Sequence, residues 1–305
     1  MNKIILTVCL IMPINATSAQ DNQSRIDSLV TMLKTAGREW NNYAIPLIEI
    51  GEPAVPALVE AVRDRNLRPF NRRISAMTLN DIHSPQWVRP ALSILFDRDE
   101  DPVLRNHVTA GLKGFDLSDV RYDLWKVYEE VSDEFRRLNL AGLLMDADTA
   151  MAYRAFYKLF NSTDGYVQQS SLLHLVEIRP GESTSWFLKG IQLDDWMTGN
   201  LAMDSLVTSD YFNADDLISV FNEQGSGEEI KWRITYIFGH RQEPESLSLL
   251  LDALQDRSWL VHTEAAVGLC RFETEKVNVE MTKLKNDSRD YVRNNSRWVI
   301  NHMKK

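Results

Sequence analysis

Hydrophobic and polar residues follow a pattern along this chain that repeats every 31 to 33 residues. In each copy an apolar residue, often followed by a basic one, opens a run in which small and apolar residues return at helical spacing. The clearest copies begin at Leu104, Val261 and Val292. A period near this length is typical of an α-solenoid, in which helix pairs stack against their neighbours. The pattern therefore predicts an all-α fold.

The copies align when the first apolar position of each second helix is taken as position 1. Position 1 is occupied by Asn71, Leu104, Phe135, Val167, Thr198, Ile230, Val261 and Val292. The intervals between successive position-1 residues are 33, 31, 32, 31, 32, 31 and 31 residues. Position 9 is apolar in all eight copies, and position 5 is small or apolar in seven, with Asn139 as the exception. Positions 1, 5, 9 and 12 share one helical face, so we expect that face to be buried.

A second amphipathic stretch lies between these segments and supplies the other helix of each pair. The expected first helices cover residues 55–62, 88–96, 120–128, 152–160, 186–191, 217–221, 247–254 and 277–284, and 26–36 and 40–50 form an additional N-terminal pair. The turns inside the pairs carry carboxylates that can cap the following helix, namely Asp64, Asp101, Asp133, Asp164, Asp256 and Asp287. We predict a right-handed α-solenoid of about eight to nine helix pairs.

The segment at residues 50–62 reads Ile-Gly-Glu-Pro-Ala-Val-Pro-Ala-Leu-Val-Glu-Ala-Val and resembles the HEAT repeat, in the short form named after phycobilisome lyases. Pairs such as Leu104-Arg105 are similar to the second helix of that family. The resemblance covers roughly residues 24–305 and weakens in the fifth copy, where Thr198 and Gly199 replace the apolar-basic pair. It implies second helices that line a concave face, and a binding role in place of one fixed reaction.

The N-terminus has the three parts of a secretory signal peptide. Lys3 supplies a basic start, residues 4–14 are apolar, and Thr17 and Ala19 stand at the −3 and −1 positions of a cut before Gln20. The apolar run has 11 residues, whereas a spanning helix needs roughly 20. The alternatives are an uncleaved anchor, a buried first helix or a lipoprotein modified at a cysteine within the apolar run. We expect residues 1–19 to be removed.

Removal of the signal peptide leaves residues 20–305 as one solenoid domain, periplasmic or secreted. This mature chain has 33 basic and 43 acidic residues, a net charge of −10. The charge disfavours nucleic acid and anionic membrane surfaces as partners. Its single cysteine, Cys270, cannot form an internal disulfide. No later segment is long and apolar enough to enter a membrane, and we expect a monomer.

Signatures of catalysis or of metal and cofactor binding are missing from the sequence. The six histidines stand singly, and Cys270 has no neighbour that would activate a thiol. The acidic run at 97–101 begins like a calcium loop, but Pro102 occupies the glycine position and Val108 the position of the bidentate carboxylate. We interpret the run as a turn that caps the next helix. We predict no catalytic residue, no metal ligand and no cofactor.

The remaining candidate is a surface on the second helices, where positions 3, 7 and 10 point away from the expected core face. Trp232 and Tyr236 occupy positions 3 and 7 of the sixth copy, and Trp298 occupies position 7 of the eighth. Arg73 and Arg137 hold position 3 in copies one and three. Aromatic residues outside a core often anchor interfaces, so these five are the predicted partner-binding residues. The alternative is a phase error of one residue, which would place the aromatic rings in the core.

These features favour an exported scaffold that holds a protein or peptide partner on its concave face. A lyase-like enzyme or chaperone, acting on a bound cofactor or protein, is the alternative that the family name suggests. A HEAT-like DNA glycosylase is disfavoured, because it would need a basic groove and the mature chain is acidic.

The first prediction concerns the mature N-terminus. Protein purified from its native host should begin close to Gln20, because the small residues at Thr17 and Ala19 fit a signal-peptidase site. Mass spectrometry of the intact protein measures this directly. Soluble cytoplasmic protein that still begins at Met1 would contradict the prediction.

Overall fold

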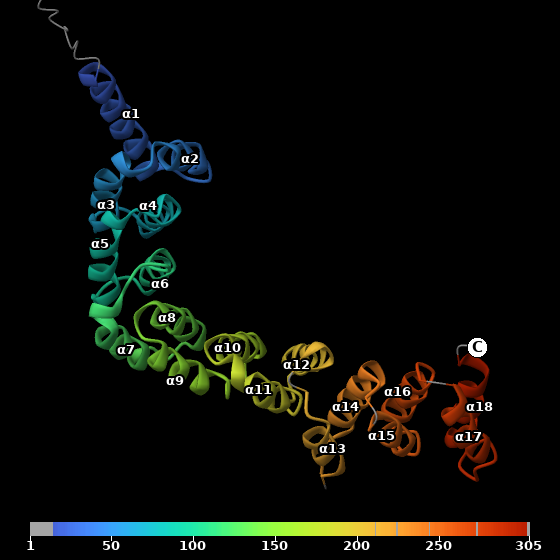
Figure 1. Ribbon diagram of the computed structural model, residues 1–305. Helices are drawn as coiled ribbons and strands as arrows, with labels where there is room; N and C mark the ends of the chain where they lie inside the picture. The colour runs from blue at the N-terminus through green and yellow to red at the C-terminus, as the bar shows by residue number, and fades with distance from the viewer. Residues whose placement is uncertain (1–14, 211, 224, 244, 273, 304–305) are drawn as a thin grey trace, which may run out of the picture. The chain divides into compact units, whose positions relative to one another are not determined.

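The computed structural model describes residues 15–210, 212–223, 225–243, 245–272 and 274–303. Within these residues the chain forms eighteen α-helices and no β-strand. Taken in chain order, the helices make nine consecutive pairs (Figure 1). The predicted all-α solenoid and its number of helix pairs are therefore confirmed.

The helix bounds follow the predicted amphipathic stretches within about three residues, except that α1 begins at Asn15 and not at residue 26. The first helices are α1 (Asn15–Thr35), α3 (Val55–Arg63), α5 (Pro85–Phe96), α7 (Arg121–Glu130), α9 (Thr149–Leu159), α11 (Ser183–Gly190), α13 (Ala214–Asn222), α15 (Ser246–Ala253) and α17 (Thr274–Leu284). The second helices are α2 (Asn41–Ile50), α4 (Pro69–Ile82), α6 (Pro102–Gly111), α8 (Glu134–Ala147), α10 (Gly165–Ile178), α12 (Trp196–Thr208), α14 (Glu228–Arg241), α16 (Trp259–Leu269) and α18 (Asp290–His302). Short 3₁₀ turns precede α3, α7 and α11.

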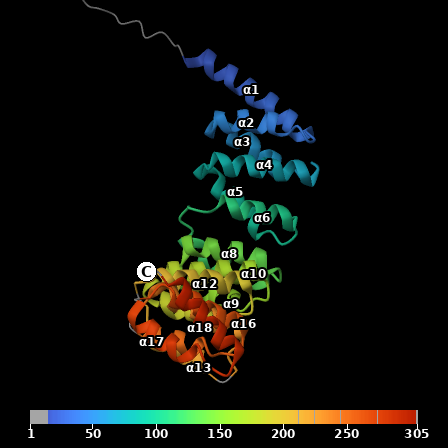
Figure 2. The same ribbon diagram turned by 90° about the vertical axis from the view of Figure 1, so that its right-hand side faces the viewer.

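The chain divides into two compact units, one up to Ala152 and one from Tyr153 onward. In the first unit α3, α5 and α7 form one layer, and α4, α6 and α8 form the other (Figure 1). Figure 2 shows α2, α4, α6 and α8 stacked one after another. In the second unit α10, α12, α14, α16 and α18 each contact the next. The second helices therefore form a continuous layer within each unit.

The predicted buried face is confirmed in most copies. Position 9 is buried from Leu79 in the first copy to Leu269 in the seventh, and Ile300 is half-buried. The alignment of the third copy was wrong, because Phe135 is 49% exposed. Helix α8 is capped by Asp133, and position 1 of every other copy stands three residues after the N-cap.

The third copy therefore starts one residue later, at Arg136. Leu140 and Leu144 then fill positions 5 and 9, and both are buried. The sequence pattern favoured Phe135 as position 1 because Phe135 is more apolar than its neighbour Arg136. Phe135 is, however, the second residue of α8, and its side chain projects away from the packed face. The shift also moves Arg137 from position 3 to position 2.

Position 2 carries a recurring contact within the helix pair. Its side chain donates a hydrogen bond to a carbonyl at the end of the preceding helix, as Arg72 Nε does to Val62 O at 2.7 Å and Arg105 Nε to Leu95 O at 2.9 Å. Arg137 donates to Val131 O and Gln168 to Phe160 O, each one residue past a helix end, and Arg293 donates to Asp287 O in the turn that follows α17. The last carbonyls of a helix have no intrahelical donor, so this side chain acts as a clip that satisfies them.

The fifth copy keeps the clip although Gly199 stands at position 2. Arg233 reaches across from α14, and its Nη1 donates to Ile191 O and Leu193 O, both at 2.8 Å. The Arg233 side chain is fully buried. A Cβ at Gly199 would lie 2.2 Å from the Arg233 Cζ atom, so only glycine leaves room for the guanidinium. The sequence pattern weakens here because the donor comes from the next repeat.

The predicted acidic caps divide into two groups. Asp101, Asp133 and Asp164 accept a backbone N–H in the first turn of α6, α8 and α10 and are true N-caps. Asp64, Asp256 and Asp287 instead accept the N–H two residues onward, inside the turn itself. The cap prediction is therefore correct for half of the set, and the rest stabilise the turn geometry.

The predicted signal peptide falls largely on residues 1–14, which lie outside the described residues. Helix α1 begins at Asn15 and continues past the expected cleavage position between Ala19 and Gln20. None of the helices in the described part of the chain combines the length and apolar character of a membrane span.

The second prediction tests the clip of the fifth copy. Gly199→Ala should lower the free energy of unfolding by about 2–4 kcal/mol, because the new methyl group displaces Arg233 and leaves two carbonyls unpaired. In an Arg233→Leu background the same substitution should be neutral, or stabilising by up to about 1 kcal/mol, since alanine favours the helix over glycine. Chemical denaturation of the wild type, both single variants and the double variant measures the coupling. Additive effects would contradict the proposed contact.

Candidate partner-binding surface

Four aromatic rings meet on α12 and α14 and form what we call the aromatic patch, made of Trp196, Trp232, Tyr236 and His240. The rings of Trp196 and Trp232 stack with centroids 5.4 Å apart and planes 9° from parallel. Tyr236 lies 6.3 Å from Trp232, and His240 lies 3.9 Å from Tyr236. Trp196 is 53% exposed, so the patch opens to solvent at this end.

Local structure explains why these rings meet. Asp195 caps α12 and makes Trp196 the first residue of that helix, while Trp232 and Tyr236 lie one turn apart on α14. Because α12 and α14 pack side by side, the first turn of one reaches the second turn of the other. Sequence spacing gave the pairing of Trp232 with Tyr236, but it did not identify Trp196.

Two alternatives were open for Trp232 and Tyr236, the surface or the core. Both side chains are half-buried, which places them at the edge of the core with one side toward solvent. The expectation for position 10 was wrong, because Gly239 is buried. A Cβ there would lie 2.9 Å from the Gly268 Cα, so this position is where α14 and α16 approach most closely.

Elsewhere in the second unit, exposed large hydrophobic side chains also lie mostly on the second helices. Among its described residues, eight large hydrophobic side chains are exposed, and six of them lie on second helices: Tyr166, Leu173, Trp196, Met197, Trp259 and Trp298. Trp298 is 40% exposed and stacks on His302 with ring centroids 4.4 Å apart. Concentrated exposure of this kind marks a contact surface more often than scattered apolar residues do.

Both signs of charge occur on the helices that carry the aromatic patch. Lys231 is paired with Asp256 at 3.1 Å, and Arg271 donates to the Gly239 carbonyl. Asp204 on α12 and Glu229 on α14 are exposed carboxylates. The basic side chains Lys231 and Arg271 are thus engaged within the protein, whereas these two carboxylates face solvent on the same helices as the patch.

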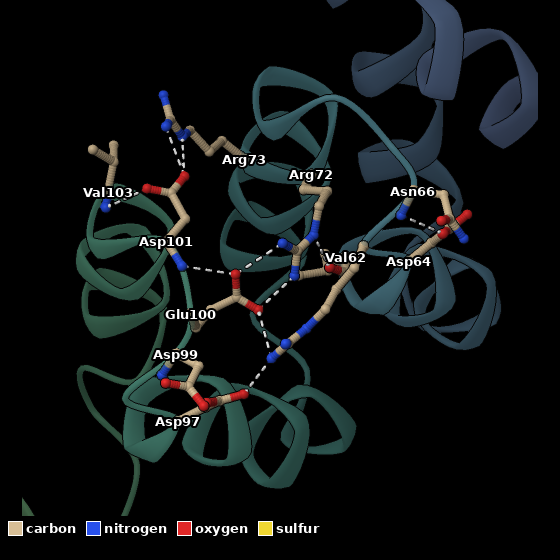
Figure 3. A network of polar contacts seen from close by, with 11 residues as sticks. Val62, Asp64, Asn66, Arg72, Arg73, Asp97, Asp99, Glu100, Asp101 and Val103 are labelled. Atoms are coloured by element: carbon tan, nitrogen blue, oxygen red, sulfur yellow. Dashed lines mark hydrogen bonds and ion pairs between the residues drawn. The ribbon is translucent and has the colours of Figure 1, made fainter.

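Arg73 lies at position 3 of the first copy, as predicted, but its guanidinium is engaged within the protein. Its Nη2 lies 2.6 Å from Asp101 Oδ2, and its Nε donates to the same oxygen at 2.9 Å. Asp101 is also the N-cap of α6, so the ion pair ties α4 to the next second helix (Figure 3). Arg137 stands at position 2, where it forms the intra-repeat clip. These two arginines therefore serve the packing of repeats.

The acidic run at 97–101 forms the inter-helix turn that the sequence predicts. Glu100 is buried and accepts hydrogen bonds from Arg72 through both carboxylate oxygens, at 2.8 and 2.7 Å (Figure 3). Arg65 pairs with Asp97 at 2.6 Å. The hydrogen bond from Arg72 holds the pKa of Glu100 below its ordinary value, against the effect of burial. The turn is therefore an inter-repeat ion-pair network. The described residues contain no His, Cys, Asp and Glu group of three or more that could hold a metal ion.

Cys270 is half-buried at the C-terminal end of α16 and forms no disulfide. Burial raises the pKa of its thiol above the ordinary value, so the neutral form dominates at neutral pH. A half-buried, neutral thiol is typical of a packed cysteine.

Comparison with known proteins gives a limited result. No protein-family model matches the chain, and no curated protein matches it. Among solved structures the chain is similar to human deoxyhypusine hydroxylase in complex with glycerol, at 13% identity over 94% of this chain and 98% of that one, with a TM-score of 0.38. An engineered protein matches at 14% identity over 95% and 92%, with a TM-score of 0.34. A designed armadillo repeat protein matches at 13% over 82% and 99%, with a TM-score of 0.17. Structural similarity this weak does not support a conclusion about function.

The third prediction uses the network around Glu100. Glu100→Gln should lower the free energy of unfolding at neutral pH by about 3 kcal/mol, because it removes the charge that compensates buried Arg72. The folded-state pKa of Glu100 lies below the ordinary value of 4.5, so its contribution is present above pH 4.5 and is lost as the pH falls through the folded-state value.

Thermal melts of wild type and variant across an acid series measure this effect. The difference between their melting temperatures should shrink as the pH falls below 4.5. If the difference in melting temperature stayed constant with pH, the loss of stability in the variant would not come from the missing carboxylate charge, and the prediction would be wrong.

Proposed function

We propose that this protein is an exported HEAT-like scaffold that binds a protein or peptide through the second-helix layer of residues 153–305. The observation that carries the proposal is the aromatic patch, with the stacked Trp196 and Trp232 at its open end. Trp259, which is 65% exposed, and Trp298 add exposed rings on α16 and α18. Aromatic side chains on a rigid helical support are well suited to anchor a partner.

Physical magnitudes support a binding role for these rings. Apolar surface gains roughly 25 cal/mol for each Å² removed from water, so a buried tryptophan supplies a large share of the free energy of an interface. A stacked pair also loses little conformational freedom on binding, because the two rings already restrict one another. The partner therefore meets a surface that is largely preorganised.

Charge narrows the class of partner. The mature chain carries a net charge of −10, and the carboxylates of Asp204 and Glu229 are exposed on α12 and α14. A basic protein or peptide with apolar side chains complements such a surface, whereas nucleic acid does not.

Export rests on the residues at the N-terminus, where a basic start, a short apolar run and a small-residue exit occur in the order of a signal peptide. The lyase-like alternative has no observation in its favour beyond the family name. We therefore place binding, with no reaction, at the centre of the proposal.

The fourth prediction tests the aromatic surface. Trp196→Ala and Trp298→Ala should each weaken partner binding by about 1–3 kcal/mol and leave the thermal stability nearly unchanged, because both rings are exposed. The partner is first captured from the host's exported proteins on the immobilised mature chain, and its affinity is then measured by calorimetry with purified components. Tyr122→Ala, which removes an exposed ring from first helix α7, is the matched control and should bind like the wild type.

Trp232→Ala separates anchoring from packing. If its ring serves mainly as core, the variant should lose roughly 3–5 kcal/mol of stability, as buried aromatic residues do. Tryptophan variants that all melt far below the wild type would refute the proposed surface and assign these rings to packing.

A further inference from the structure

One arginine in the first unit stands where the repeat has no place for a charge. Arg136 is position 1 of the third copy, and this position holds Asn71, Leu104, Val167, Thr198, Ile230, Val261 or Val292 in the other seven copies. Its side chain is half-buried. A partly buried cation at a packing position is unfavourable unless an opposite charge meets it.

The neighbour of Arg136 is another arginine. Arg136 and Arg105 line the same crevice of about 10 Å³, together with Leu95, Val127 and Leu140. Burial and then the nearby Arg136 charge lower the pKa of Arg105 from its ordinary value, although the carboxylates of Glu130 and Asp97 act in the opposite direction. The Arg105 Nε donates to the Leu95 carbonyl, which is uncharged. Two guanidinium groups therefore share one crevice and repel each other.

The crevice adjoins a larger cavity that contains further basic groups. This cavity has a volume of about 260 Å³, and Arg105 and Val127 belong to both. Its charged lining is Arg98, Arg105, Asp123, Lys126 and Glu130. Together, the crevice and the cavity bring four basic side chains against two acidic ones, in a protein whose net charge is negative.

The acidic groups nearby offset this excess only in part. Glu130 forms an ion pair with Arg98, and Asp97 pairs with Arg65 at 2.6 Å. In the described part of the chain, no carboxylate lies within ion-pair distance of Arg105, Lys126 or Arg136. The local excess of two positive charges would be neutralised by a dianion. Two guanidinium groups can donate hydrogen bonds to different oxygens of the same anion.

We propose that the crevice between Arg105 and Arg136, with Lys126 at its mouth, is a binding site for a phosphate group. One phosphate oxygen enters the crevice, which has room for about one water-sized group, and the remaining oxygens face the cavity. Arg105 has its Nε on the Leu95 carbonyl and its terminal nitrogens available for the anion. The site lies in the first unit and does not depend on the aromatic patch.

A variant can separate binding from structural support. Arg136→Leu restores the apolar residue typical of position 1 and removes the repulsion with Arg105. It should keep or raise the melting temperature and abolish phosphate binding. If Arg136 had only a structural role, the same substitution would lower the melting temperature and leave phosphate binding, if any, unchanged.

The experiment is isothermal titration of the mature chain with inorganic phosphate at low ionic strength. The wild type should bind with a dissociation constant on the order of 1 mM or below, and Arg136→Leu should show no measurable heat. Arg89→Gln removes an exposed charge from α5 outside the cavity and is the matched control. Lys126→Gln, at an exposed position, should weaken binding about tenfold and serves as the second variant if Arg136→Leu does not fold.

Two further titrants identify the source of the phosphate and test its charge. Phenyl phosphate that binds more tightly than inorganic phosphate assigns the site to a phosphate monoester, and the opposite order assigns it to the free ion. Acetate should bind much more weakly than either. Acetate binding as tight as phosphate, no phosphate binding to the wild type, or equal binding by the wild type, Arg136→Leu and Lys126→Gln would overturn the proposal.

Discussion

The contact that recurs most often through the fold is the hydrogen bond from position 2 of a second helix to carbonyls at or just beyond the end of the helix before it, made in copies one to four and in copy eight. Those carbonyls carry the negative end of the helix dipole, so an arginine there supplies both a donor and a favourable charge. Arg72 and Arg105 make the bond within their own pair, and Arg233 makes it from the next repeat where Gly199 leaves space. In a solenoid each pair rests only on its neighbours, so closing one pair in this way also supports the pairs beside it.

Arginine residues close together in sequence have different roles because their neighbours differ. Arg72 is clipped to a helix end and paired with buried Glu100, and Arg73 holds the cap of the following second helix. Arg136 has neither kind of partner and faces Arg105 across a crevice. In the acidic turn at 97–101, the carboxylates of Asp97, Glu100 and Asp101 are engaged by arginines of the first copy. Within the described part of the chain, the positive charges of Arg105 and Arg136 have no ion-pair partner, and for this reason the crevice between them is a candidate anion site.

The two units therefore present different chemistry. The second unit concentrates exposed rings on its second helices, with carboxylates beside them, and this combination favours a basic partner with apolar side chains. The first unit contains a small basic cavity suited to a compact anion. Both units are built from the same kind of helix pair, so the difference arises from exposed rings in the second unit and from a charged residue at packing position 1 of the third copy in the first.

The sequence by itself determined the all-α repeat, the helix pairs and most of the buried face, because a helical period repeated eight times averages out local exceptions. It also placed Trp232 and Tyr236 on one side of one helix, since that follows from local spacing. It misplaced Phe135 and Arg137 by one position, because a cap at Asp133 outweighs apolarity in setting where α8 begins. Only the tertiary structure brought Trp196 onto Trp232, Arg233 under Gly199 and Arg136 beside Arg105. Those contacts join residues about one repeat apart, and their geometry depends on how neighbouring helices pack, which no single helical period encodes.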